Sequence, residues 1–270
     1  MKIVTFNVNG IRSRLHQVKA VIDKYSPDLI ALQETKCVDD AFPFKDVEEM
    51  GYHAEVFGQK GYHGVAILSK KTPNKIQKGF ATDDSSAQRR FISVEYDFVG
   101  SQKLTFMNGY FPQGESRDHP EKFPCKRKFY SDLLSLLKEN YKPTDNILIV
   151  GDMNVAPTDK DIGIGEQNAK RWLKTGKCSF LPEEREWVQA LVDWGTTELY
   201  RAKYPDSTKL SWFDYRSAGF ESEPKHGLRL DLLLGTKFVL EHCTNIEIDH
   251  EIRGMEKPSD HCPVIAEFKD

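Results

Sequence analysis

The sequence has no long hydrophobic run. Its longest strictly apolar stretches are four residues, such as 29–32 and 147–150, whereas a membrane-spanning helix needs about 18. The first residues lack the basic and apolar regions of a secretory signal peptide. The five cysteines form no C-x-x-C pair, so neither a disulfide framework nor a zinc knuckle is expected. We therefore expect a cytoplasmic protein without membrane association.

An excess of one charge is also lacking. The 38 basic and 41 acidic residues leave a formal net charge of −3, which argues against a protein that coats nucleic acid. A nucleic-acid enzyme needs only local basic patches. Two are present, and each is equally compatible with a solvated surface. They comprise Lys122, Lys126, Arg127 and Lys128, and Lys170, Arg171, Lys174 and Lys177.

Two common catalytic motifs are missing. The chain contains no G-x-x-x-x-G-K-[ST] and no G-x-S-x-G segment, which excludes a P-loop and the nucleophile elbow of a serine hydrolase. Disorder is excluded as well, because 11% aromatic residues and a near-neutral charge balance are typical of chains that bury a core.

Short β-branched runs, whose lengths favour strands, recur from end to end of the chain. They cover residues 3–6, 29–32, 65–68, 91–96, 104–107, 147–150, 228–234 and 264–268. Helical spacing separates some of them, as in Leu15, Val18 and Ile22, with Ser13 as the expected N-cap. No linker or repeat interrupts the alternation. We expect one α/β domain over residues 1–270, whose two sheet-rich halves pack face to face.

Polar residues stand where four of these strands end. Asn7 follows the run at 3–6, and Glu34 follows the run at 29–32. Tyr110 follows the run at 104–107, and Asp152 and Asn154 follow the run at 147–150. Ligands gather at strand ends in such sheets, because loops there aim side chains from a rigid base. Four such ends are unlikely to arise from turn chemistry alone.

Three further residues belong to this pattern. Asp231 interrupts an apolar run and is costly to bury unless it is paired, either with Arg229 or with a functional partner. Asp260 and His261 precede the last strand, where they form either a polar turn or a catalytic pair.

If Glu34, Asp152, Asp231 and Asp260 converge, their repulsion requires protonation or a bound cation. Carboxylate oxygens favour Mg²⁺ or Mn²⁺ over zinc. A hard cation beside a carboxylate, a histidine and amide donors is suited to phosphoester hydrolysis.

Eight segments are similar to signatures of the exonuclease III family of abasic-site endonucleases. They are FNVNGIR at 6–12, LQETK at 32–36, NGYFPQG at 108–114, ESRDHP at 115–120, GDMN at 151–154, CSFLPEER at 178–185, SWFDYR at 211–216 and SDH at 259–261. Any one of them is a weak signal, but eight in order cover essentially the whole chain.

The resemblance implies a four-layer α/β sandwich, with two mixed sheets packed between helices and the site at one rim. It implies a Mg²⁺-dependent DNA repair nuclease, with Mn²⁺ as a substitute, that incises duplex DNA 5′ to abasic sites. It also implies 3′-to-5′ exonuclease activity and removal of phosphate and sugar remnants from 3′ ends, by a monomer.

The resemblance also implies residue roles. Metal binding involves Asn7, Glu34, Asp152, Asn154 and Asp260. In catalysis, Asp152 orients or deprotonates water, and His261, oriented by Asp231, contacts the phosphate. Asn154 holds the phosphate, and Tyr110 contacts the phosphate or assists the leaving group. DNA contacts involve Gln113, His261, and the apolar pair Trp212 and Phe213, which would receive the flipped abasic sugar. Ordinary core packing is the alternative for that pair.

Three other functions are weighed against this one. A secreted DNase would need a signal peptide and disulfides. Phosphatases acting on inositol phosphates or sphingolipids would not need Trp212 and Phe213. A DNA-binding module without catalysis would have lost a ligand, but every expected acidic position and His261 are present. Cys262, beside that histidine, is where oxidants could act.

Overall fold

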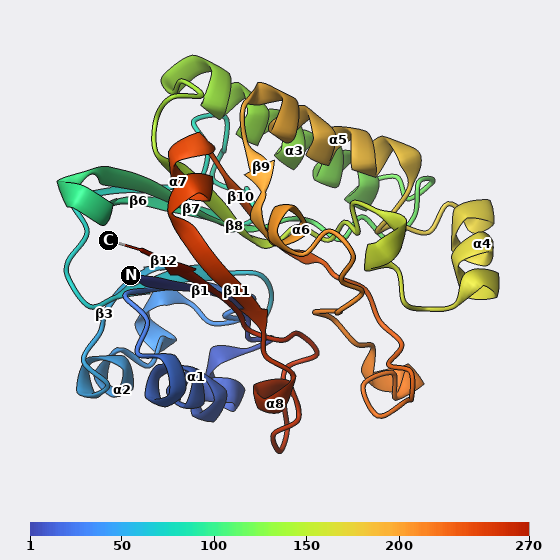
Figure 1. Ribbon diagram of the computed structural model, residues 1–270, viewed down its shortest axis with the longest axis horizontal. Coiled ribbons are helices and arrows are strands. Elements are labelled where there is room, and N and C mark those ends of the chain that lie inside the picture. The colour runs from blue at the N-terminus through green and yellow to red at the C-terminus, as the bar shows by residue number, and fades with distance from the viewer. Residues whose placement is uncertain (270) are drawn as a thin grey trace.

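Two six-stranded sheets form the centre of the computed structural model, which describes residues 1–269 (Figure 1). In spatial order the first consists of β11 (Cys243–Ile248), β12 (Val264–Phe268), β1 (Lys2–Asn7), β2 (Leu29–Gln33), β4 (Val65–Ser69) and β3 (His53–Phe57). The second consists of β5 (Lys75–Lys78), β6 (Phe91–Asp97), β7 (Lys103–Tyr110), β8 (Ile147–Asp152), β10 (Asp231–Gly235) and β9 (Thr197–Glu198). Both sheets are mixed, because β1 runs parallel to β2 and β7 parallel to β8 while their other neighbours are antiparallel.

Successive side chains of a strand face opposite sides of its sheet, so each sheet packs against the other sheet on one side and against helices on the other. In β1, Ile3 faces the second sheet and packs in a core with Phe106 and Leu148, while Val4 and Phe6 face outward. The helices are α1 (Ile11–Tyr25), α2 (Phe44–Glu49), α3 (Lys122–Asn140), α4 (Glu166–Thr175), α5 (Pro182–Trp194), α6 (Leu199–Lys203), α7 (Lys237–His242) and α8 (His250–Arg253). α1 and α2 pack on the outer face of the first sheet, and α3 and α5 on that of the second. The predicted four-layer α/β sandwich is confirmed.

All eight predicted strands exist, and all eight are internal strands of a sheet. The four strands that the sequence did not predict, β3, β5, β9 and β11, are the four sheet edges. The run at 228–234 was predicted too long at its start, because Leu228 forms only isolated bridges to Ile162 and Trp212 before β10 begins at Asp231.

The predicted N-cap of the first helix is wrong. Ser13 lies inside α1, which begins at Ile11 after Gly10. The amides of Gly10 and Ile11 donate to the carbonyls of Glu34 and Thr35. The helix start is therefore held by the neighbouring strand end and needs no side-chain cap.

Within the described residues no helix has both the length and the hydropathy needed to cross a bilayer. All five cysteines are free thiols, which agrees with the absence of a disulfide framework.

A buried amide pair joins the two sheets at the end where the predicted site residues lie. Gln33 of β2 donates to Asn108 Oδ1 of β7 over 2.8 Å. The Asn108 amide donates in return to the carbonyls of Leu32 and Ala66, each over 2.9 Å. Both side chains are fully buried, so these bonds form where water does not compete.

We predict that Asn108→Ala lowers the free energy of unfolding by about 2–4 kcal/mol, because it leaves buried amide and carbonyl groups without partners. Urea denaturation measures the loss. The exposed Asn140 of α3 provides the control, since Asn140→Ala should change stability by less than about 1 kcal/mol. Equal effects of the two substitutions would contradict the role of the amide pair.

Candidate active site

Side chains from both sheets meet where strands β1, β2 and β8 end. Asn7 ends β1, and its amide nitrogen lies 3.2 Å from Glu34 Oε1 and 3.0 Å from Asp152 Oδ2. Glu34 follows β2 of the first sheet, and Asp152 ends β8 of the second. One buried amide therefore binds a carboxylate from each sheet.

Strand register brings the next carboxylate to Asp152. In the antiparallel pair of β8 and β10, Asp152 stands directly opposite Asp231. Gly151, the residue before Asp152, has φ of +142°, and a Cβ there would lie 1.9 Å from the carbonyl oxygen of Gly109. Only glycine permits this approach of β8 to β7, which explains the glycine before Asp152.

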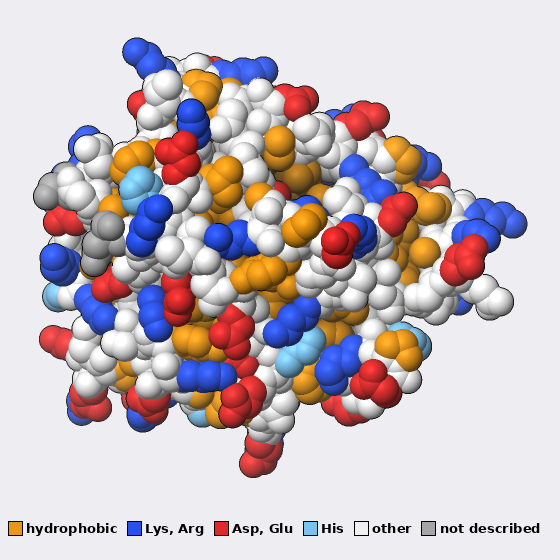
Figure 2. Space-filling view, viewed as in Figure 1, with side chains coloured by type: hydrophobic (Ala, Val, Ile, Leu, Met, Phe, Trp, Pro, Cys, Tyr) orange, Lys and Arg blue, Asp and Glu red, His pale blue; other side chains and the backbone are white. Residues whose placement is uncertain are grey.

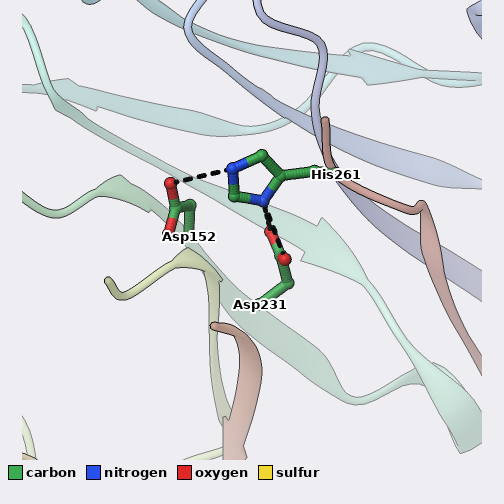
Figure 3. A group of neighbouring side chains, drawn as sticks. All are labelled: Asp152, Asp231 and His261. Atoms are coloured by element: carbon green, nitrogen blue, oxygen red, sulfur yellow. Dashed lines mark hydrogen bonds and ion pairs between the residues drawn. The ribbon is translucent and has the colours of Figure 1, made fainter. Parts of the chain in front are cut away.

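His261 lies between the two aspartates, as Figure 3 shows. Its Nδ1 is 3.0 Å and 2.9 Å from the two carboxylate oxygens of Asp231, and its Nε2 is 3.6 Å from Asp152 Oδ2. All three residues are buried. Asp231 is thus paired with His261, which is the functional alternative weighed for it above.

The alternative partner, Arg229, is engaged elsewhere. Its guanidinium lies 2.7 Å from Asp161 and 2.9 Å from Glu198. The second oxygen of Asp231 accepts instead from Ser211 Oγ over 2.6 Å. This serine, like Ser259, whose hydroxyl donates to the Asn7 carbonyl over 2.6 Å, was not predicted as a site residue. Both serines lie in the quoted SWFDYR and SDH segments, which was the available signal.

The protonation of this cluster follows from its burial. Burial alone would lower the pKa of His261, but Asp231 and Asp152 outweigh it and raise that pKa to about 10. Burial, opposed by His261 and reinforced by Asp231 and Glu34, raises the pKa of Asp152 to about 7. The ring is therefore held as an imidazolium beside a carboxyl group that exchanges its proton near neutrality.

Glu34 and Tyr110 form the opposite side of the site. Burial works against the charge on Glu34, yet Lys36, with its ammonium 3.0 Å away, and Tyr110 hold the pKa of Glu34 below its usual value. Burial and the Glu34 charge raise the pKa of Tyr110 well above its usual value, so its phenol stays a hydrogen-bond donor. The Arg90 guanidinium stacks 4.5 Å from the centre of the Tyr110 ring.

Asn154 and Gln113 lie on the loops after β8 and β7. Asn154 is buried, and its side-chain amide donates to Asp152 Oδ2 over 3.1 Å and to the Phe111 carbonyl over 2.9 Å. Gln113 is exposed, and its side-chain oxygen accepts from the Glu115 amide over 2.7 Å. Glu34 and Asn154 share a further property, since each has φ of +52°, in the left-handed region that non-glycine residues rarely adopt.

Asp260 and Trp212 are joined at the rim of the site. Asp260 Oδ2 accepts from Trp212 Nε1 over 3.0 Å, and its Oδ1 accepts from the Asn9 amide over 2.9 Å. Asn9 was not predicted as a site residue. Its side-chain oxygen also accepts from Lys36, so Asn9 connects Asp260 to the cation beside Glu34.

The predicted apolar pair divides between two environments. Trp212 is partly exposed, whereas Phe213 is 0% exposed and packs against Phe220 and His250, with ring centres 5.1 Å and 5.5 Å away. Phe213 thus shows the core packing of the alternative weighed above, and Trp212 alone presents a surface.

Cys262 lies beside this core and is fully buried. Burial raises the pKa of its thiol well above the usual value. A protonated, inaccessible thiol reacts slowly with oxidants, so oxidation of Cys262 is not favoured in the folded protein.

The basic clusters also differ from one another. In the first, Lys126 is completely buried, and Lys122 and Lys128 pair with Glu115 and Asp132, so only part of this cluster, with the exposed Arg127, is available as a basic surface. In the second, Arg171 and Lys177 line a cavity of about 190 Å³ that Trp212 also lines. Figure 2 shows Lys and Arg side chains projecting from the end of the molecule where α4 lies, on a face of otherwise mixed charge.

The donor set fits a hard cation. Asp152, Asp231 and His261 offer ligand atoms within 4.8 Å of one another, but Nδ1 of the ring is already bonded to Asp231. The ionised Glu34 carboxylate is the more accessible oxygen donor, and the Lys36 ammonium shows that positive charge is stable beside it. Carboxylate and amide oxygens are ligands that Mg²⁺ and Mn²⁺ prefer.

The profile of the Endonuclease/Exonuclease/phosphatase family matches residues 4–261. The chain belongs to this family. Among the family's proteins it is 52% identical to exodeoxyribonuclease III of Haemophilus influenzae, over 100% of both chains. Its fold superimposes with a TM-score of 0.89 on an AP endonuclease from Archaeoglobus fulgidus, at 33% identity and full coverage of both.

A second family structure is similar to the same degree. It is the D146N variant of a 3′ phosphatase from Neisseria, bound to a product DNA hairpin, with a TM-score of 0.88, 33% identity and full coverage of both chains. The prediction of an enzyme with the exonuclease III and AP-endonuclease type of fold is therefore confirmed.

We predict that, in protein stripped of metal, the His261 ring stays doubly protonated through neutral pH and titrates near 10. An exposed histidine titrates near about 6.5. Asp231→Asn removes one of the negative charges that favour the imidazolium and should lower this value by about one unit or more. NMR of the imidazole nitrogens across the pH range measures both, and a wild-type ring that loses its proton between pH 6 and 7 would contradict the assignment.

Proposed function

We propose that the chain is a Mg²⁺-dependent DNA repair nuclease, with Mn²⁺ as a substitute. It hydrolyses the phosphodiester 5′ to abasic sites in duplex DNA, digests 3′ ends exonucleolytically, and removes phosphate and sugar remnants from them. The observation that carries the proposal is the buried Asp152–His261–Asp231 arrangement at an edge that both sheets share.

This arrangement supports hydrolysis at phosphorus. The oxygen of a water molecule bonds to phosphorus while the bond to O3′ breaks, and the water proton passes to Asp152. A carboxyl group whose pKa is about 7 suits proton transfer at neutral pH. The His261 imidazolium, fixed by Asp231, stabilises the charge on the phosphate oxygens.

Tyr110 acts at the leaving group. Its raised pKa keeps the phenol protonated, so the hydroxyl donates its proton to O3′, and solvent restores it. Asn154 and Asn7 hold the Asp152 carboxylate through their amides. Glu34, with Asn7 and Asp260 nearby, is the side of the site that would hold the cation, which would supply charge neutralisation at the phosphate.

The choice of an abasic site follows from the cost of flipping. A nucleotide without a base neither stacks nor pairs, so turning it out of the duplex costs a few kcal/mol less than flipping an intact one. Trp212, partly exposed beside Asp260, provides the apolar surface for the bare sugar. The adjoining basic cavity with Arg171 and Lys177 suits backbone phosphates.

The relatives support the range of substrates. They include an exodeoxyribonuclease III, an AP endonuclease and a 3′ phosphatase bound to product DNA. A role in base excision repair, as a monomer in the cytoplasm and as one catalytic domain over residues 1–270, is part of the same proposal.

We predict strict dependence on a divalent metal, because carboxylates around an anionic phosphate require a cation. The assay follows cleavage of one duplex with a single abasic site, against the same duplex with an intact base, in EDTA and after adding Mg²⁺. Incision inside the duplex should occur only at the abasic site and only with the metal, whereas metal-dependent shortening from the 3′ ends should occur in both duplexes. Full cleavage in EDTA by thoroughly stripped protein would refute the metal dependence, and equal internal incision of both duplexes would refute the abasic specificity.

We predict that Asp152→Asn and His261→Asn each lower the cleavage rate about 10²-fold or more, as for loss of a general base or an oxyanion donor. Duplex affinity should change far less, because it depends mainly on Lys and Arg contacts to phosphates. Asp206→Asn, at a carboxylate that is 91% exposed, is the matched control. A wild-type rate in either site variant would remove the role assigned to that residue.

We predict that Trp212→Ala weakens incision at abasic sites while leaving the melting temperature nearly native, because the ring is partly exposed. Phe213→Ala should instead cost about 3–5 kcal/mol of stability, since that ring is fully buried. Circular dichroism melting and incision per folded molecule separate the two. If Trp212→Ala melts early and its folded fraction incises normally, the ring serves the core only.

A further inference from the structure

Helix α3 directs two polar side chains, one turn apart, at the loop that follows β8. Lys126 is completely buried, and its ammonium donates to the carbonyls of Asn154 over 2.9 Å and Gln113 over 3.2 Å. Tyr130, also buried, donates its hydroxyl to the Met153 carbonyl over 2.7 Å. Two consecutive peptide groups after Asp152 are therefore held from the same helix.

The third hydrogen bond that the Lys126 ammonium donates is to the carboxylate of Glu184 in α5. That carboxylate is also completely buried, and its other oxygen accepts from the amides of Ser179 and Leu181, each over 2.8 Å. Every donor of the ammonium and both oxygens of the carboxylate thus have partners. The pair fixes Lys126 in a single position between two helices and the loops of the site.

Stability alone does not require a charge at this place. Buried ion pairs often contribute little compared with well-packed apolar residues of similar volume. The carbonyls that the ammonium holds belong to Asn154 and Gln113, two residues assigned to the site, which points to a role in their placement.

The backbone at Asn154 shows why restraint matters. Its φ of +52° lies in the left-handed region, where non-glycine residues need support from their surroundings. In this conformation the Asn154 amide donates to Asp152 Oδ1 over 2.9 Å and its side chain to Oδ2 over 3.1 Å. The orientation of the Asp152 carboxylate therefore depends on the conformation of Asn154, since Tyr130 holds the carbonyl of the preceding peptide group and Lys126 holds the carbonyl of Asn154 itself.

We propose that Lys126 and Tyr130 are positioning residues that act through Asn154 to orient the Asp152 carboxylate. This inference rests on the proposed function, in which Asp152 accepts the proton of the attacking water. Lys126 also ties the Gln113 loop, expected to contact DNA, to the same peptide, so one buried cation connects the expected substrate contact to the base.

Two variants test the inference. Tyr130→Phe removes one hydroxyl and keeps the ring, and Lys126→Met with Glu184→Gln removes both charges together, so that no unpaired charge remains buried. Lys128→Met, at an exposed lysine of the same helix, is the matched control. Single-turnover cleavage of the abasic duplex, duplex affinity and melting temperature are measured for each, and amide hydrogen exchange is followed at Asn154.

We expect the double variant to cleave about 10- to 100-fold more slowly, as for misplacement of a reacting group, and Tyr130→Phe to show a smaller loss. Duplex affinity should stay within about threefold, since the phosphate contacts are untouched. The Asn154 amide should exchange faster in both variants, and the Lys128→Met control should match the wild type in every measurement.

Wild-type cleavage rates and wild-type exchange at Asn154 in the folded variants would overturn the inference. If the double variant does not fold, Tyr130→Phe decides by the same two readouts. A wild-type protein that leaves the abasic duplex intact would refute the proposed function, whereas exchange at Asn154 would still show whether the two side chains hold this peptide.

Discussion

The site depends on a fixed distance between the strand ends of the two sheets. Neither sheet contains the site alone, because Glu34 belongs to the first and Asp152 and Asp231 to the second. The Asn7 amide connects the two sheets at the site itself, and the Gln33–Asn108 pair connects the same two sheets in the interior. These amides are buried, so each bond is stronger than it would be in water and each unmade bond is costly. The sandwich is thereby a rigid frame for groups that must lie within tenths of an ångström of their working places.

Charge sets the second constraint. Burial together with the charges of Asp231 and Glu34 raises the pKa of Asp152, and His261 and Lys36 supply compensating positive charge. Burial prevents water from screening these interactions. The result is a cluster in which the pKa of Asp152 is raised while that of Glu34 is lowered, so the two carboxyl groups can take different roles.

Much of the fold could be predicted from the sequence because internal strands are apolar on both faces. The runs at 29–32, 65–68 and 147–150 correspond to fully buried strands. The edge strand β5 is largely polar and exposed, and β3 buries only Val56, so neither contains the continuous apolar run that marks the internal strands. Their pairing is decided by the neighbouring strand and not by their own residues.

The carboxylates and the histidine singled out in the sequence lie together in the structure, whereas Asn9, Ser211 and Ser259 were missed. Asn7, Glu34, Asp152 and His261 are marked by their positions beside strand ends, whereas the position of Asp231 opposite Asp152 is fixed by the register of β10 against β8. Lys126 shows the opposite failure. It was grouped with surface lysines by sequence distance, although the fold buries it between α3 and α5. The sequence shows that Lys126 is charged, but only the tertiary structure shows that this charge is buried.

The left-handed backbone at Glu34 and Asn154 sets folding and activity against each other at the same two positions. Glycine would adopt φ of +52° without steric strain, so selection for stability alone would favour it there. Glycine also lacks the carboxylate and the amide that the site uses. Sequence design guided only by backbone geometry would therefore remove the two functional side chains, and variants enriched by heat selection should be checked first at these two residues.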